Sequence, residues 1–247
     1  MSLRACSCLV LLACCAAADG PPVLHLPFEG SLAGGGREDF SAKPFGDGVS
    51  YDGGVAGQCL FVDGSGDWID VELEDRVRLQ GGGTLALWFK RDDWENPYKG
   101  GSGWQTIAHL DGMGVNLTAP GCPLHEPWAI EGSVERWSTN GGTSVTARTA
   151  GGFVRPDAWH HVAVTFDAAS ARAPHGGGRA RLYVDGKLQE TQDNAPVPTE
   201  KMVNPLRIGT WFKSNQAFRG WIDEVKVYDY PLTPAQVADD AGNPTSP

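Results

Sequence analysis

The last third of the chain is built from short apolar runs that alternate with polar residues. In residues 159–166, Val162, Val164 and Phe166 are separated by single residues. Successive side chains of an extended strand point to opposite faces, so these three residues share one face. The pattern predicts a strand with one buried face.

The runs that follow are joined by turns. Residues 181–188 are two strand-like runs joined at Asp185-Gly186, a dipeptide that tolerates the positive φ angles of a tight hairpin. Residues 222–228 form a last run, and Pro231 ends it because proline cannot donate to a strand ladder. Earlier runs of the same kind are residues 23–28, 58–62, 67–73, 84–90, 105–109, 114–117, 128–131, 134–138 and 143–148. Roughly a dozen short strands with regular turns are typical of an antiparallel sandwich or barrel.

One helix is expected, at residues 233–238, where Thr233 is the N-cap and Pro234 occupies the first helical position. We expect one domain over residues 19–240 and a disordered tail over residues 241–247. The 229 residues that follow residue 18 are enough for one β-sandwich with a full core.

Residues 1–18 have the three parts of a secretory signal peptide: one positive charge, a short apolar core and a run of small residues at 16–18. We therefore expect the mature chain to start near Asp19 and to be secreted. The alternative is a lipoprotein anchored at Cys14, because residues 11–14 resemble a lipoprotein box. No later segment approaches the roughly 20 apolar residues of a membrane span.

Charge and cysteine content limit the partners. The net charge is −10 and no lysine- or arginine-rich run exists, which argues against binding to nucleic acid or to anionic membranes. After residue 18 only Cys59 and Cys122 remain. They form either one disulfide, in an oxidising compartment, or two separately buried thiols. Neither cysteine has metal-ligand spacing with the histidines, so a zinc site is not expected.

Seven pieces of the sequence carry a family resemblance. In order they read LPFEGSL, GQCLFVDGSGDWIDV, TLALWFKR, DAWHHVAVTFD, ARLYVDGKL, LRIGT and GWIDEVKVYDYPLT. This order resembles laminin-G-like domains of the concanavalin A-like lectin/glucanase superfamily, of the type found in secreted bacterial proteins. The resemblance implies an all-β jelly-roll sandwich of two antiparallel sheets. That superfamily holds lectins, adhesion modules and hydrolases, so the fold does not fix the function.

Catalytic residues are not expected. Glucanases of the superfamily carry a Glu-x-Asp-x-x-Glu motif on one strand, and this sequence has none. Of its acidic clusters, the pair Glu131 and Glu135 is one of the nearest to that motif. The adjacent His160 and His161 should point to opposite faces of a strand, which indicates a structural role. A divergent glycoside hydrolase is therefore the least favoured function.

The resemblance also implies a calcium ion at the edge of the sandwich, held by a late aspartate and an early loop. Carried over by motif, these are Asp223 of GWIDEV and Asp63 of FVDGSGDW. Calcium prefers carboxylate and carbonyl oxygens presented on turns. The alternative is that Asp63 only shapes its own turn through hydrogen bonds from the backbone.

Aromatic residues in loops are the candidate ligand-binding residues. Trp94, Tyr98 and Trp104 lie in a long polar insertion, and Trp211 and Asn215 lie between the last two strands. Carbohydrate sites stack aromatic rings on sugars, and binding residues concentrate on loops. The alternative is that these rings pin their loops to the sandwich. Trp88 and Trp159 sit in strand patterns, so we expect them in the core.

The sequence thus predicts a secreted, non-catalytic module that recognises a glycan or glycoprotein, with a possible structural calcium ion. A structural or adhesion protein that binds another protein is the second hypothesis.

Overall fold

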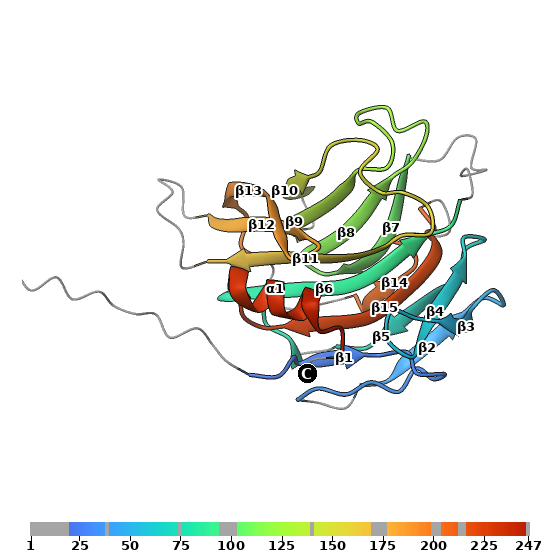
Figure 1. The fold of residues 1–247 in the computed structure, drawn as a ribbon. Coiled ribbons are helices and arrows are strands. Elements are labelled where there is room, and N and C mark those ends of the chain that lie inside the picture. Colours follow the sequence, from blue (N-terminus) through green and yellow to red (C-terminus); the bar gives the residue numbers. More distant parts are fainter. Residues whose placement is uncertain are drawn as a thin grey trace, which may run out of the picture.

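The computed structural model describes residues 20–37, 40–73, 76–93, 103–138, 141–168, 177–198, 204–211 and 216–245. The predicted signal peptide and the alternative anchor at Cys14 lie outside these ranges. Within them the chain forms two antiparallel β-sheets packed face to face and one helix (Figure 1). The predicted all-β sandwich is therefore confirmed. None of the described helical residues forms a segment with the length and hydropathy of a membrane span.

The first sheet, sheet A, has eight strands. Its order is β13-β12-β11-β6-β15-β4-β3, and β1 pairs with β15 outside this path. The strands are β1 (Leu24–Leu26), β3 (Ser50–Gly53), β4 (Gln58–Asp63), β6 (Gly82–Arg91), β11 (Trp159–Asp167), β12 (Gly178–Val184), β13 (Lys187–Ala195) and β15 (Arg219–Tyr228). The hairpin between β12 and β13 turns at Asp185 and Gly186, both of which have positive φ, as the sequence predicted.

The second sheet, sheet B, has seven strands in the order β10-β9-β8-β7-β14-β5-β2. They are β2 (Ala42–Phe45), β5 (Trp68–Val71), β7 (Trp104–Leu110), β8 (Met113–Thr118), β9 (Ile130–Ser138), β10 (Gly141–Arg148) and β14 (Leu206–Ile208). Strands β7, β8, β9 and β10 are antiparallel neighbours with continuous register over most of their length. They form a stiff platform, which carries the candidate site described below.

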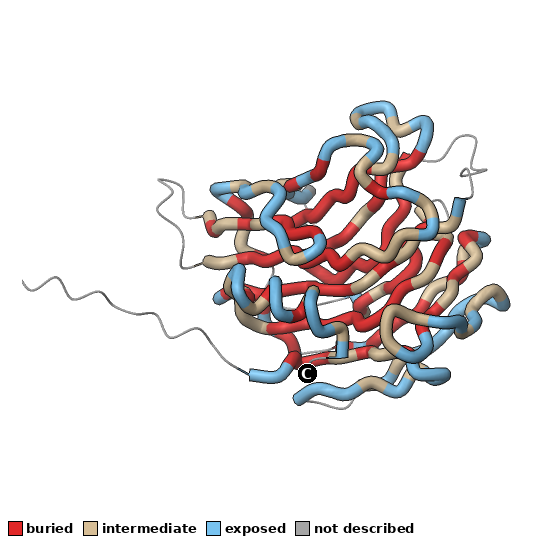
Figure 2. Tube along the Cα trace, viewed as in Figure 1, coloured by how far each residue is buried: buried red, intermediate tan, exposed pale blue. Residues whose placement is uncertain are grey.

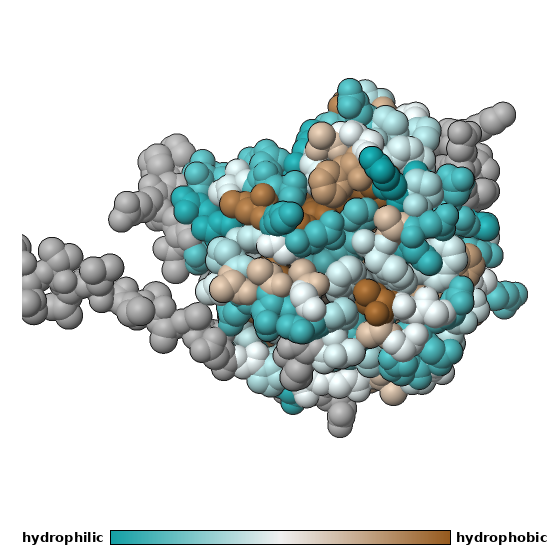
Figure 3. Space-filling view, in the orientation of Figure 1, coloured by the Kyte–Doolittle hydropathy of each residue, from teal (hydrophilic) through white to brown (hydrophobic). Residues whose placement is uncertain are grey.

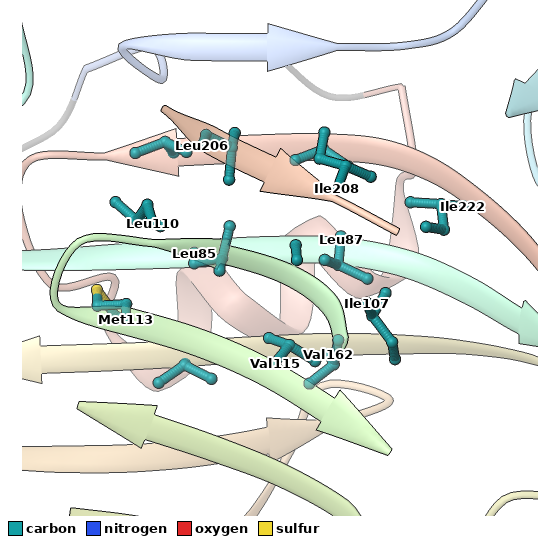
Figure 4. Close-up of a cluster of buried hydrophobic side chains, with 14 of the residues drawn as sticks. Leu85, Leu87, Ile107, Leu110, Met113, Val115, Val162, Leu206, Ile208 and Ile222 are labelled. Carbon is teal, nitrogen blue, oxygen red and sulfur yellow. The ribbon is translucent and has the colours of Figure 1, made fainter. Parts of the chain in front are cut away.

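The hydrophobic core fills the space between the two sheets. Figure 4 shows Leu85 and Leu87 of β6 and Val162 of β11 from sheet A beside Ile107 of β7 and Val115 of β8 from sheet B. Buried residues follow the strands and exposed residues collect in the loops (Figure 2). Val164 and Phe166 are also in this core, so the predicted buried face of β11 is confirmed.

Helix α1 (Pro234–Gly242) covers the outer face of sheet A. Its N-terminus carries a complete capping box between Thr233 and Gln236, as the Thr-Pro signal predicted. Val237 packs in a second apolar cluster with residues of β6, β11, β12 and β15, namely Ala86, Ala163, Tyr183 and Tyr228, and with Leu232. On the side of the molecule that carries α1, hydrophobic residues form small separate patches among hydrophilic ones (Figure 3). The helix includes Ala241 and Gly242, so the chain remains structured beyond residue 240.

Buried charges fasten α1 to sheet A. Lys226 of β15 donates from Nζ to Asp240 Oδ1 of α1 at 2.7 Å and to the Pro244 carbonyl at 3.1 Å. His161 Nε2 lies 3.0 Å from the other oxygen of Asp240. Burial would raise the pKa of Asp240, but the hydrogen bond from His161 and the charge of Lys226 outweigh it and hold the pKa below its usual value. The helix is therefore held by a buried hydrogen-bonded ion pair as well as by apolar packing.

Two expectations about buried side chains need correction. Trp88 and Trp159 are half-buried on the outer face of sheet A, because Leu85, Leu87 and Phe89 take the inward positions of β6 and leave the even-numbered residues outside. Cys59 and Cys122 are both free thiols, so the disulfide is not formed, and of the two only Cys59 is buried while Cys122 is half-buried.

Candidate functional site

The candidate site starts from one register position that crosses sheet B. His109 of β7 pairs with Gly114 of β8, Gly114 pairs with Ser133 of β9, and Ser133 pairs with Thr146 of β10. A Cβ atom at residue 114 would lie 2.9 Å from His109 Cδ2 and 3.0 Å from Ser133 Oγ. Because Gly114 has no side chain, its backbone forms a floor between the polar side chains of His109 and Ser133.

A second row lies two residues further along β8, β9 and β10, and three residues along β7, whose register with β8 shifts between Thr106 and Ala108. Thr106 of β7 pairs with Asn116 of β8, Asn116 with Glu131 of β9, and Glu131 with Arg148 of β10. Residues two apart on β8, β9 and β10 share a face, so both rows point to the same side of the sheet. On β7, Thr106 Oγ1 donates to Asn116 Oδ1 at 2.8 Å, which places Thr106 on that same side. Val115 and Val134 point the other way, into the core, which places both rows on the outer face.

These rows form an open groove of about 350 Å³. The loops between strands add its rims. The lining residues are Trp104, His109, Asn116, Leu124, His125, Glu131, Ser133, Glu135, Thr146, Arg148, Trp211 and Gln216. A smaller cavity of about 40 Å³ adjoins it, shares His109 and Trp211, and is otherwise lined by Asn204, Pro205 and Arg207.

One end of the groove is organised around Glu131. Its Oε2 accepts a 2.7 Å hydrogen bond from Trp104 Nε1, and Trp104 meets the ring of His125 edge-on at 6.2 Å between centroids. Arg148 Nη1 lies 2.8 Å from His125 Nδ1. Because arginine only donates, His125 Nδ1 accepts this bond, and the neutral ring then carries its proton on Nε2. Trp104 is thus held by its N–H, with its ring at the rim.

The other end is organised around Glu135. Ser133 Oγ donates to Glu135 Oε1 at 2.7 Å, and His109 Nε2 lies 3.4 Å from Glu135 Oε2. The His109 ring packs against Trp211, with 5.2 Å between centroids. Each end of the groove therefore joins one tryptophan, one histidine and one buried carboxylate.

The structure brings together two of the five predicted ligand-binding residues. Trp104 and Trp211 both line the groove, whereas Trp94, Tyr98 and Asn215 lie outside the described residues. The groove is completed by Glu131 and Glu135, which the sequence suggested only as an acidic cluster, and by His109 and His125, which the sequence did not single out as ligand-binding residues. The alternation Glu131-Gly-Ser133-Val-Glu135 was the available signal, because it puts three polar residues on one face of a strand.

The two predicted calcium ligands lie apart. Asp63 of β4 pairs with Arg219 of β15. Asp223 lies four residues further along β15, so the usual strand rise places its Cα atom about 13 Å from that of Arg219. Asp63 Oδ1 accepts from Ser65 N at 2.7 Å, which is the turn-shaping alternative. Burial would raise the pKa of Asp63, but hydrogen bonds with Asp67 and Ser65 lower it.

Asp223 is fully buried against the turn formed by residues 54–57. Its Oδ2 accepts from Val55 N and Ala56 N, and its Oδ1 accepts from Glu224 N. Burial raises the pKa of Asp223 to about 7, with a further contribution from the charge of Glu224. Glu29 contacts the same turn, where its Oε2 accepts from Gln58 N at 3.1 Å. No group of three acidic, histidine or cysteine side chains within the described ranges is arranged to hold a metal ion.

Comparisons with known proteins agree with this architecture. A family model, Laminin_G_3, described as the concanavalin A-like lectin/glucanases superfamily, matches residues 63–238. Comparison with curated protein sequences gives no match.

Similar solved structures include domain 4 of AbnA, a GH43 extracellular arabinanase from Geobacillus stearothermophilus, in complex with arabinotriose. The TM-score is 0.64 at 18% identity, over 90% of this chain and 100% of that one. The receptor binding domain of botulinum neurotoxin mosaic serotype C/D gives a TM-score of 0.65 at 16% identity, over 90% of this chain and 51% of that one. The binding domain of Paraclostridial Mosquitocidal Protein 1 gives a TM-score of 0.67 at 12% identity, over 90% of this chain and 52% of that one. The chain thus spans all of the arabinanase domain and about half of each toxin chain.

Proposed function

Because this chain belongs to the concanavalin A-like lectin/glucanases superfamily, we propose that it binds carbohydrate in the groove on sheet B and does not hydrolyse it. The observation that carries the proposal is the composition of that groove. Two half-buried tryptophans, Trp104 and Trp211, stand at its ends, and two buried carboxylates lie between them. Sugar sites combine aromatic faces for the C–H surfaces with fixed polar groups for the hydroxyls.

Rigidity supports the same function. Glu131, Ser133 and Glu135 belong to one strand that is paired on both sides, so their spacing is set by the hydrogen-bond ladder. Polar groups held in this way lose little freedom when a ligand binds. The arabinanase domain, which shares the fold, is bound to arabinotriose.

The carboxylate spacing argues against hydrolysis. Glycosidases hold two carboxyl groups about 5–5.5 Å apart for retention or about 6.5–9.5 Å apart for inversion. Glu131 and Glu135 are four residues apart on β9, so the strand rise places their Cα atoms about 13 Å apart. Ser133 occupies the position between them, where a carboxylate would have had a suitable spacing. The groove thus has binding groups without a correctly spaced acid pair.

A glycan array tests the proposed function. We expect the wild-type chain to bind neutral oligosaccharides, and Trp104→Ala and Trp211→Ala each to weaken binding by about tenfold or more, equivalent to about 1.4 kcal/mol. The matched control is Trp221→Ala, which removes a half-buried tryptophan from the outer face of sheet A and should leave binding unchanged.

A chain that binds no glycan on the array would contradict the proposal. Recovery of a protein partner that still binds the Trp104→Ala and Trp211→Ala variants would instead favour the adhesion hypothesis.

Calcium binding is a separate proposal, and it rests on Asp223 rather than Asp63. Asp223 and Glu29 would supply carboxylate oxygens and the turn between them carbonyl oxygens, which are the ligands calcium prefers. A cation beside Asp223 would also stabilise a buried negative charge, to which the backbone N–H groups of Val55, Ala56 and Glu224 donate hydrogen bonds.

The calcium proposal is tested by measuring the Tm of thermal unfolding in calcium and in chelator. Saturating calcium is expected to raise Tm by about 5 °C. The raised pKa of Asp223 means that its ionisation lowers stability as pH rises from about 4 through about 7, so the calcium effect should grow over that window. Asp223→Asn should abolish the calcium effect and Asp63→Asn should retain it. Equal Tm values in calcium and chelator would rule the site out.

A further inference from the structure

Glu131 has one carboxylate oxygen that is not hydrogen-bonded. The residue is 4% exposed, and Trp104 Nε1 donates only to Oε2. Oε1 is buried and has no hydrogen-bond partner among the described residues. His125 Nε2 lies 3.5 Å from it and Arg148 Nε 3.8 Å. The arginine adds charge attraction, and neither contact is a well-formed hydrogen bond.

A buried acceptor without a donor is costly, and ionised acceptors are the costliest. Glu131 lines a groove that is open to a ligand, so a ligand hydroxyl that reaches Oε1 would supply the missing donor. Glu135 differs, since Ser133 already donates to it at 2.7 Å and His109 lies beside its other oxygen. The two carboxylates of β9 are thus unequal, and only Glu131 has a vacant acceptor.

The cation beside Glu131, Arg148, does not make the groove attractive to a negatively charged ligand. Arg148 points one guanidinium nitrogen at His125 and another towards Glu131, so its charge is already engaged by groups of the protein. A ligand carboxylate at Oε1 would bring a second acceptor and a second negative charge to the same point, which is unfavourable.

We infer that Glu131 Oε1 accepts a hydrogen bond from a sugar hydroxyl and makes the groove selective for uncharged saccharides over acidic ones. This inference rests on the proposed function and names its substrate class. Glu131 acts here as a specificity-determining residue that contacts the saccharide directly, and Trp104 holds its carboxylate in place through Oε2.

The test uses arabinotriose, cellotriose, mannotriose and galactotriose, each with a counterpart in which the primary hydroxyls are oxidised to carboxylates. Titration calorimetry of the wild-type chain should show at least one neutral trisaccharide bound about tenfold or more tightly than its oxidised form. Glu131→Gln should weaken neutral binding roughly 10- to 100-fold, the size of a hydrogen bond to a charged group, and narrow the discrimination. Glu72→Gln, the matched control at an exposed carboxylate that does not line the groove, should leave neutral binding unchanged.

The possible failures are distinguishable. If no saccharide binds the wild-type chain, the proposed function and this inference both fall. If saccharides bind and require Trp104 and Trp211, but Glu131→Gln binds equally well, only the inference is overturned. Oxidised saccharides that bind the wild-type chain as tightly as neutral ones overturn it as well, and that comparison needs no variant to fold.

Discussion

Replacing Lys226 with alanine is expected to lower the free energy of unfolding by about 3–5 kcal/mol, the cost of breaking a buried ion pair by removing one partner. Lys226 is 1% exposed, and its ammonium group lies 2.7 Å from Asp240 and 3.9 Å from Glu224. Without it, the Asp240 carboxylate stays buried with His161 as its remaining close partner. Urea unfolding at pH 7 measures the loss.

The pH dependence separates lost charge from lost packing. The pKa of Asp240 is depressed in the folded protein, so its contribution is present above its ordinary value near 3.8 and is lost as pH falls through the lower folded value. The difference between wild type and Lys226→Ala should therefore shrink below about pH 4. Lys226→Met combined with Asp240→Leu should recover part of the stability, because it removes both buried charges. A loss below 1 kcal/mol at pH 7 would contradict the role given to this network.

Replacing Gly132 with leucine should destabilise the fold by about 3 kcal/mol, at the upper end for over-packing a core. Gly132 lies on β9 between Glu131 and Ser133 and faces sheet A. A Cβ atom there would lie 2.6 Å from Val164 Cγ2 and 3.1 Å from Leu182 Cδ1. The strand would have to move outward and would carry both groove residues with it. Saccharide affinity should therefore fall together with stability.

The control for this substitution is Gly53→Leu. Gly53 is also a strand glycine, on β3, but a Cβ atom there would meet nothing within 4 Å. Its effect should stay within about 0.5 kcal/mol. Chemical denaturation and calorimetry on the same samples test the pair. Unchanged saccharide affinity in a destabilised Gly132→Leu would separate the groove from the packing of β9.

Local patterns predicted most strands because each has a clear buried face and a clear turn. Two strands were missed for identifiable reasons: β2 contains Pro44, which disfavours a strand reading, and β3 is short and polar. The runs at residues 128–131 and 134–138 were expected as separate strands, but residues 130–138 form the single strand β9. Gly132 resembled a break in the sequence, whereas it marks a close approach of the two sheets.

The groove was only partly predictable. Trp104 and Trp211 were chosen as loop aromatics, although Trp104 is in fact the first residue of β7. The floor depends on register between strands, which aligns His109, Gly114 and Ser133 across three strands. A single sequence shows alternation within a strand but not which residues of different strands stand side by side. For that reason Glu131 was read as half of an acid pair rather than as one member of a row with Asn116 and Arg148.

The first described residue, Gly20, and the C-terminal helix α1 both lie on the side of the molecule opposite the groove. Gly20 is hydrogen-bonded to the Tyr230 hydroxyl, and α1 lies against the outer face of sheet A, whereas the groove opens on the outer face of sheet B. A fluorescent label, a biotin or a second protein attached at Gly20 or after α1 would therefore leave from the side opposite the groove. Immobilised through such a tag, the domain would display its groove towards solution, an orientation suited to a glycan-capture reagent.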